Sequence, residues 1–335
     1  MAREDRQAAR RSAASQMSEE GAGGPRRGRR RKTWAMRQTT FAPRASFEEL
    51  EIHTSDGATL RAVVDDPPEG VALRGTLVLA HAMFARKSSF GRRDRPGLSS
   101  ALAARGFRTV AFDFRGHGDS SPPSGASWCY DDLVRQDLPA VVDCARARGE
   151  GHPVLVVGHS LGGHVTLAAQ GTGRIAADAV VAVGASVWLR EIERSRLRWG
   201  AKRAIARALL AISVRAGGVP ARRLRLGSDD ASERFLRDLR RIVAEGEWRS
   251  ADGKDDYLRS LASVKVPVAA VVGDRDRVIC PPSAGEAFAR RCTGAVAYFR
   301  APVGHMALVT SAGGHPSVVA AVEWALARVL DQARP

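Results

Sequence analysis

One serine stands at the junction of a buried strand and a helix. Residues 154–163 read VLVVGHSLGG, with Ser160 between Gly158 and Gly162. This G-x-S-x-G spacing leaves room for a strained turn that exposes the serine hydroxyl. The hydroxyl then lies at the amino end of a helix, whose amide groups favour a developing negative charge. We therefore predict that Ser160 is a nucleophile.

A serine hydroxyl needs a base to activate it, and the base needs an acid to orient it. Both follow later in the chain, each after an apolar run typical of a strand. The segment VVGDRDRVICPP contains Asp274 and Asp276, and FRAPVGHMA contains His305. The alternative is a packing turn, in which small residues let a strand and a helix approach closely. Three candidate groups at three strand ends, in the order Ser, Asp, His, favour catalysis.

The surrounding segments alternate between short apolar runs and amphipathic runs. The segment FEELEIHTSDGATLRAVVDD, residues 47–66, predicts a hairpin that turns at Asp56 and Gly57. Short apolar runs predict strands, at residues 75–82, 107–118, 153–158, 178–185, 266–274 and 295–301. Helical spacing predicts helices, at residues 96–106, at 131–148 with a break or restart near Pro139, from Ser160, at 283–291 and from Pro316. This alternation predicts a parallel sheet covered on both faces, with functional residues at the carboxyl ends of its strands.

With these motifs in place, residues 47–332 resemble a serine hydrolase of the α/β-hydrolase superfamily. The resemblance implies a mostly parallel central sheet flanked by helices, with an inserted helical cap. It implies that Ser160 is the nucleophile and that His305 is the base. In this family the acid usually lies three residues beyond the glycine that ends its strand, which here leads from Gly273 to Asp276. Asp274 is the alternative acid.

Two further segments carry the resemblance. LVLAHA resembles the family's His-Gly segment, which implies that the backbone N–H groups of Met83 and Leu161 form the oxyanion hole. Ala82 stands where the family usually has glycine. FDFRGHGDS resembles a loop that is mainly structural in the family, so catalytic roles are not expected for its polar residues Asp113, Arg115 and His117.

The other histidines have simpler interpretations. His81 belongs to the oxyanion loop, and His159 and His164 are expected to pack around the elbow. His315 precedes Pro316 and is expected to be a surface cap of the last helix, with the base of the triad as its alternative role.

Residues 186–265 interrupt the alternation between two parts of the core, residues 46–185 and 266–335, and the resemblance implies that they form a helical cap. Two amphipathic stretches lie in this insertion, LRWGAKRAIARALLAISVRAGG and ASERFLRDLRRIVAEG. One hypothesis is that they roof an apolar acyl pocket together with Trp188 and Trp199. The alternative is that their apolar stripes simply pack onto the core.

The formal net charge of +16 is unevenly distributed. Residues 1–45 hold 12 Lys and Arg against 4 Asp and Glu, residues 186–265 hold 19 against 11, and the remainder is neutral. The composition of residues 1–45 predicts a disordered basic tail. No recognition motif or aromatic-interleaved basic patch accompanies the charge, which argues against a specific nucleic-acid partner. The cysteines show no metal or disulfide spacing and are expected to be free thiols, at Cys129, Cys144, Cys280 and Cys292.

The predicted function is a serine hydrolase that cleaves a carboxylic ester or related acyl bond through an acyl-enzyme, without a metal or organic cofactor. Ser160 argues against the dehalogenases and epoxide hydrolases of this fold, which place a carboxylate at the elbow. Two alternatives remain, an acyltransferase and a ligand-binding protein that retains the triad. The expected partner is a small, apolar acyl substrate. No run of 18 apolar residues predicts a membrane span, and we expect a cytoplasmic protein. The sequence leaves the oligomeric state open.

Overall fold

The computed structural model describes residues 47–124, 126–216 and 218–333. Within them, eight strands form one sheet in the order β1-β2-β4-β3-β5-β6-β9-β10. The strands are β1 (Phe47–His53), β2 (Thr59–Asp65), β3 (Gly75–Ala80), β4 (Phe107–Phe112), β5 (Val154–His159), β6 (Ala179–Val183), β9 (Val268–Gly273) and β10 (Val296–Ala301). The predicted basic tail at residues 1–45 lies outside the described residues.

The sheet is mostly parallel, as predicted. The hairpin of β1 and β2 turns at Asp56 and Gly57, where Gly57 has a φ of 88°, and both of its strand pairings are antiparallel. From β4 to β10 every pairing is parallel. The central strands β3, β5 and β6 are buried along their whole length, because helices cover both faces of a parallel sheet.

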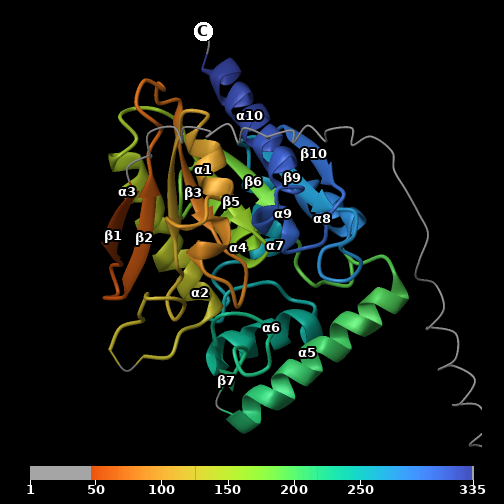
Figure 1. The fold of residues 1–335 in the computed structure, drawn as a ribbon. Helices are drawn as coiled ribbons and strands as arrows, with labels where there is room; N and C mark the ends of the chain where they lie inside the picture. Colours follow the sequence, from red (N-terminus) through yellow and green to blue (C-terminus); the bar gives the residue numbers. More distant parts are fainter. Residues whose placement is uncertain (1–46, 125, 217, 334–335) are drawn as a thin grey trace, which may run out of the picture. The chain divides into compact units, whose positions relative to one another are not determined.

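Two apolar clusters lie on opposite faces of the sheet, because successive side chains of a strand point to opposite sides. One includes residues of α1 (Leu98–Ala103) and α10 (His315–Gln332), with Phe90 of η1 (Lys87–Phe90) and Leu308 of α9 (Ala307–Thr310). The other includes residues of α3 (Leu138–Ala147), α4 (Leu161–Gly171) and α8 (Pro282–Ala289). Figure 1 shows α1 and α10 together on one side of the strands.

The helix expected over residues 131–148 has an irregular centre. It consists of α2 (Tyr130–Asp132), a π-helical turn η2 (Leu133–Asp137), and α3. Pro139, near which we expected a break, lies within the first two positions of α3. Proline has no N–H to donate and clashes with the preceding turn of an α-helix. The wider π turn immediately before it lets the chain continue as a helix instead of breaking.

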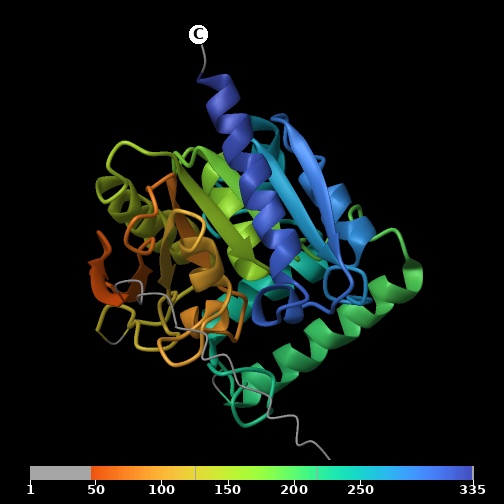
Figure 2. The same ribbon diagram turned by 45° about the horizontal axis from the view of Figure 1, so that its top comes forward.

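Residues 186–265 lie between β6 and β9 and are mostly helical. They contain α5 (Arg196–Ala216), the short strands β7 (Gly218–Val219) and β8 (Ala231–Ser232), α6 (Glu233–Glu245), α7 (Tyr257–Ser260) and η3 (Leu261–Ser263). We call this stretch the inserted segment. In Figures 1 and 2 the long helix α5 lies on its outer side, away from the strands of the sheet. None of the described helices has the length and apolar character needed to cross a bilayer.

Candidate active site

Ser160 lies in the sharp turn between β5 and α4. Its backbone has φ of 52° and ψ of −111°, a conformation that L-residues seldom adopt. A Cβ at Gly158 would lie 2.5 Å from the carbonyl oxygen of Gly162, and a Cβ at Gly162 would lie 2.3 Å from that of Ala80. Only glycine fits at either position, which explains the spacing of the motif. The strained turn holds the serine side chain out of both elements.

His305 and Asp276 meet beyond the ends of β10 and β9. His305 Nδ1 lies 2.5 Å from Asp276 Oδ2. The same carboxylate accepts the backbone N–H groups of Ile279 at 3.0 Å and Cys280 at 2.9 Å. Burial alone would raise the pKa of Asp276, but its bonds to His305 and to these two amides outweigh burial and lower the pKa. Asp276 is therefore an ionised, fixed partner for the imidazole.

The imidazole of His305 also lies beside the elbow. The preceding residue of the elbow, His159, donates from Nε2 to the carbonyl oxygen of His305 at 3.2 Å. A Cβ built on Gly184 would lie 3.2 Å from His305 Cε1, and Ser160 donates its backbone N–H to the neighbouring Val183 at 2.8 Å. Among the described residues, no hydrogen bond of 3.5 Å or less joins the Ser160 hydroxyl to His305. The structure thus brings the three groups to one edge of the sheet.

The two alternatives left by the sequence have other partners. Asp274 accepts a hydrogen bond from Arg300 Nε at 2.7 Å and is exposed. His315 contacts the carbonyl oxygen of Val309 through Nε2 at 2.9 Å, at the start of α10. In this arrangement neither side chain is a partner of the Ser160 turn.

The loop after β3 is joined to the elbow by its backbone. Gly162, the residue after Leu161, donates its N–H to the carbonyl oxygen of His81, two residues before Met83, at 3.1 Å. Within the described part of the chain, the N–H groups of Met83 and Leu161 have no protein acceptor. Two unpaired N–H groups beside a serine can stabilise an oxyanion. Ala82 is buried in this loop, and its carbonyl oxygen accepts the N–H of Ala85 at 3.1 Å.

A contact that the sequence analysis missed holds this same loop against the inserted segment. Phe84 has a φ of 62°, and its carbonyl oxygen accepts the N–H of Ser228 at 2.7 Å. Arg86 forms a two-point ion pair with Asp229, and the bond from its Nη2 to Oδ1 measures 2.7 Å. Asp229 also accepts the N–H of Gly118 at 3.1 Å. We call these contacts the loop brace. Nothing in the local sequence signals a positive φ at a phenylalanine, so only the fold reveals it.

Of the remaining histidines near the site, His81 and His159 are buried and His164 is half-buried. His81 accepts the N–H of Phe114 at Nε2, at 3.0 Å, and burial lowers its pKa well below the ordinary value. Burial also lowers the pKa of His159. His164 lies 2.9 Å from the hydroxyl of Tyr130, and burial lowers its pKa to about 3. None of these rings is a strong base at neutral pH.

The polar residues of the FDFRGHGDS loop form buried contacts. Asp113 accepts bonds from Lys87, 2.6 Å from its N–H and 2.5 Å from its ammonium group. Arg115 forms ion pairs with Asp56 and Asp137, each at 2.7 Å. These contacts tie the loop to the hairpin and to the helix before α3.

Trp188 and Trp199 are both half-buried. The indole N–H of Trp188 donates to the carbonyl oxygen of Ile279 at 3.0 Å, in the loop that surrounds Asp276. The ammonium group of Lys202 lies 5.7 Å from the Trp188 ring centre and forms a buried ion pair with Glu193 at 3.0 Å. Trp188 therefore contacts both Lys202 of α5 and the loop that surrounds Asp276.

The chain matches one family model over residues 72–300, and that family is described as serine aminopeptidase, S33. The chain belongs to this family of α/β-hydrolases. It is therefore a hydrolase, and the fold that the motifs implied is confirmed.

Solved structures share the same fold. A hydrolase from Pseudomonas aeruginosa PA01 aligns with a TM-score of 0.54 and 24% identity, over 82% of this chain and 98% of its own. Est1E from Butyrivibrio proteoclasticus, with ferulic acid bound, aligns with a TM-score of 0.56 and 20% identity, over 84% of this chain and 99% of its own.

One curated relative matches a shorter segment. Over 73 residues the hydrolase is 38% identical to lysophosphatidylserine lipase ABHD12 of Xenopus tropicalis. The match covers 22% of this chain and 17% of that lipase, so the chain spans about a sixth of the relative's length.

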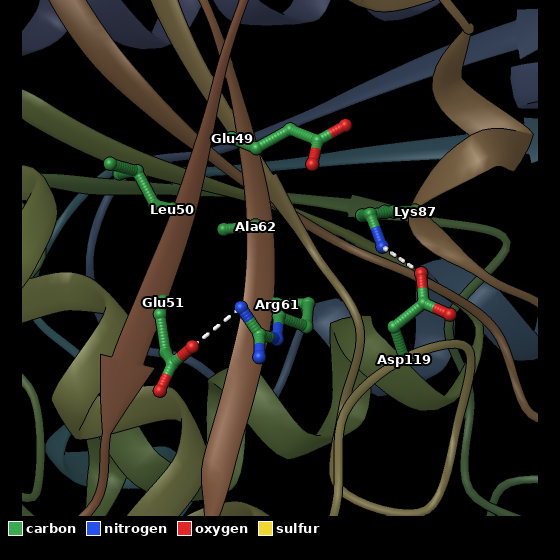
Figure 3. Close-up of a pocket in the computed structure, with 7 residues that line it drawn as sticks. All are labelled: Glu49, Leu50, Glu51, Arg61, Ala62, Lys87 and Asp119. Carbon is green, nitrogen blue, oxygen red and sulfur yellow. Dashed lines mark ion pairs between the residues drawn. The ribbon is translucent and has the colours of Figure 1, made fainter.

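Two surface hollows lie away from the Ser160 turn. One, of about 430 Å³, is lined by both strands of the hairpin and by Lys87 and Asp119 (Figure 3). A second, of about 330 Å³, shares Glu49, Lys87 and Asp119 with the first. In Figure 3 the ammonium group of Lys87 points to Asp119, with which it pairs at 3.6 Å. Neither hollow is lined by Ser160, Asp276 or His305.

Proposed function

We propose that this hydrolase cleaves a carboxylic ester or a related acyl bond through a covalent acyl-enzyme on Ser160. The observation that carries the proposal is the hydrogen bond of 2.5 Å between His305 and an ionised Asp276, beside the strained turn of Ser160. A nucleophile, a base and an orienting acid are the three groups that acyl transfer requires.

In the proposed reaction, His305 Nε2 removes the proton from Ser160 as its oxygen attacks the acyl carbonyl. Asp276 holds the Nδ1 proton and stabilises the imidazolium that forms. The N–H groups of Met83 and Leu161 donate to the oxyanion. His305 then protonates the leaving group and afterwards activates water, which releases the acid and restores the serine.

We propose that residues 186–265 act as a cap over this site and that the substrate has an apolar acyl part. The segment is tied to the two loops of the site, to Phe84 through Ser228 and to Ile279 through Trp188. The partial match to a lysophosphatidylserine lipase and the likeness to Est1E, whose structure holds ferulic acid, agree with such a substrate. Contact of Trp188 and Trp199 with the acyl chain stays a prediction.

The first test is hydrolysis of p-nitrophenyl esters of increasing acyl length, run beside Ser160→Ala and beside amino-acyl p-nitroanilides. The proposal expects turnover of esters that is lost in Ser160→Ala and an optimum acyl length. Because the matching family is described as serine aminopeptidase, turnover of the anilides tests for cleavage of peptide bonds. Ester turnover that survives in Ser160→Ala would refute the mechanism.

Two further experiments on the same protein distinguish an acyltransferase and a ligand-binding protein from a hydrolase. An acyltransferase would form the acyl-enzyme with a fluorophosphonate-sensitive Ser160 but transfer the acyl group to added alcohols faster than to water. A ligand-binding protein would bind ester analogues without turnover. Mass measurement of a fluorophosphonate adduct on wild type, absent from Ser160→Ala, identifies a reactive serine independently of substrate choice.

A further inference from the structure

The outer surface of the inserted segment combines exposed apolar side chains with uncompensated positive charge. In α5, Leu197 is 88% exposed and Val214 is 69% exposed. Beyond β7, Leu224 and Leu226 are 43% and 51% exposed. Large apolar side chains this exposed leave considerable apolar surface in contact with water.

The charge of this stretch has a single sign. Residues 194–228 contain no Asp or Glu and ten cationic residues, which are Arg194, Arg196, Arg198, Lys202, Arg203, Arg207, Arg215, Arg222, Arg223 and Arg225. Between described residues, the ion pairs of this stretch are those of Arg198 and Lys202 with Glu193. In the part of the chain that the structure describes, the exposed arginines of α5 therefore form no ion pair with a carboxylate.

The two properties share one face of α5. A helix repeats every 3.6 residues, so Arg196, Arg203, Arg207 and Val214 fall on one line along it. Leu197 and Arg215 lie about 100° further round the helix, within the same exposed half, and all six side chains are exposed. The opposite side of α5 lies along α6, and only Lys202 and Ser213 of its 21 residues are fully buried. A long helix thus presents an apolar and cationic face outward.

We propose that this face, defined by α5 and residues 222–226, docks on the surface of an anionic lipid bilayer. Exposed leucines that enter the acyl boundary, flanked by arginines that meet lipid phosphates and carboxylates, are the features of an interfacial helix. A second copy of the chain is disfavoured as the occupant, because the exposed arginines of this face would meet the same arginines of the other copy. A nucleic acid would pair with the arginines but leave the leucines in water.

The proposal does not depend on the esterase activity. It is tested by co-sedimentation of the full chain with phosphatidylcholine vesicles, with and without phosphatidylserine, at low and high salt. We expect binding only to the anionic vesicles, weakened by salt. Ser160→Ala should bind as the wild type does.

Three variants locate the binding face. Replacing Arg196, Arg203 and Arg207 together by Gln should lower the vesicle partition coefficient about 100-fold, at about fivefold per charge. Leu197→Gln with Val214→Gln should lower it at least about tenfold by removing apolar insertion. The matched control replaces Arg93, Arg95 and Arg105 by Gln and should change it little, because these arginines are exposed outside the inserted segment and form no ion pair between described residues. The far-ultraviolet circular dichroism spectrum should be unchanged in all three, which shows that each variant is folded.

Several results would overturn the proposal. Equal losses in the α5 and control triples would show that only net charge matters. Binding that persists in the α5 triple but disappears when Arg26, Arg27, Arg29, Arg30 and Arg31 are replaced by Gln would assign it to the amino-terminal segment. Binding to duplex DNA that is as tight as vesicle binding, and insensitive to Leu197→Gln with Val214→Gln, would make the face a polyanion surface.

Discussion

The edge of the sheet that carries the catalytic candidates and the helix α5 of the inserted segment differ in how they are held. Around Ser160, strands β3, β5 and β6 are wholly buried, and backbone hydrogen bonds join the elbow to His81 and Val183. Along α5, only two of 21 residues are buried, and one of these is Lys202, paired with Glu193.

This difference separates two tasks. A catalytic group must be held within a few tenths of an ångström, which requires packing and hydrogen bonds on every side. A surface that binds a substrate or a bilayer needs exposed side chains, and those side chains require less packing within the protein. The inserted segment contacts the catalytic edge at the loop brace and at Trp188, so these contacts are where it can influence the catalytic loops.

The largest expected effect concerns the base. His305→Ala should lower kcat of ester hydrolysis by about 10⁵–10⁶, as in other serine triads. His315→Ala, the matched control in α10, should change kcat only a few-fold, because its ring contacts the carbonyl oxygen of Val309. Stopped-assay rates on the best p-nitrophenyl ester measure both. Equal losses of kcat in the two variants would contradict the assignment of His305 as the base.

The two aspartates at the end of β9 provide the next contrast. Asp276→Asn should lower kcat by about 10⁴, because an amide cannot stabilise the imidazolium and orients the wrong tautomer. Asp274→Asn removes only an exposed ion pair with Arg300 and should cost less than about tenfold. The comparison uses kcat at saturating ester. A larger loss in Asp274→Asn would move the acid to that residue.

A smaller effect is expected at the loop brace. Asp229→Asn should lower kcat about tenfold with KM nearly unchanged. Loss of the ion pair loosens Arg86 and Phe84 and so displaces the Met83 N–H from a developing oxyanion. The complete loss of one such donor lowers kcat by about 10²–10³. The rate of fluorophosphonate labelling of Ser160 should fall in parallel. Asp255→Asn, which disturbs a comparable ion pair with Arg135, is the control. A fall in stability with an unchanged labelling rate would make the brace merely structural.

The smallest effects compare the stability of the two regions. Leu155→Ala in β5 should lower the free energy of unfolding by about 2–5 kcal/mol, because the side chain is fully buried. Leu197→Ala in α5 should change it by less than about 0.5 kcal/mol, because that side chain is almost fully exposed. Urea unfolding followed by circular dichroism measures both. A large loss at Leu197 would mean that α5 is packed against another part of the protein.

Much of the fold was predictable from local pattern. The Asp56-Gly57 turn and the short apolar strands are local signals, and Gly57 indeed has a positive φ of 88°. The π turn before Pro139 was not foreseen, because proline signals a break equally well when the helix continues through a wider turn. The order of the strands in the sheet depends on pairings between distant segments, which no local window contains.

The candidate site divides in the same way. The sequence by itself determined the chemical types, since Ser160, Asp276 and His305 stand in motifs whose glycines and strand ends can be recognised locally. Only the tertiary structure decided which partners each group has, such as His305 for Asp276, Arg300 for Asp274 and Asp229 for Arg86. The physical reason is that side-chain type and backbone turn are properties of neighbouring residues, whereas hydrogen bonds and ion pairs join residues that only folding brings together.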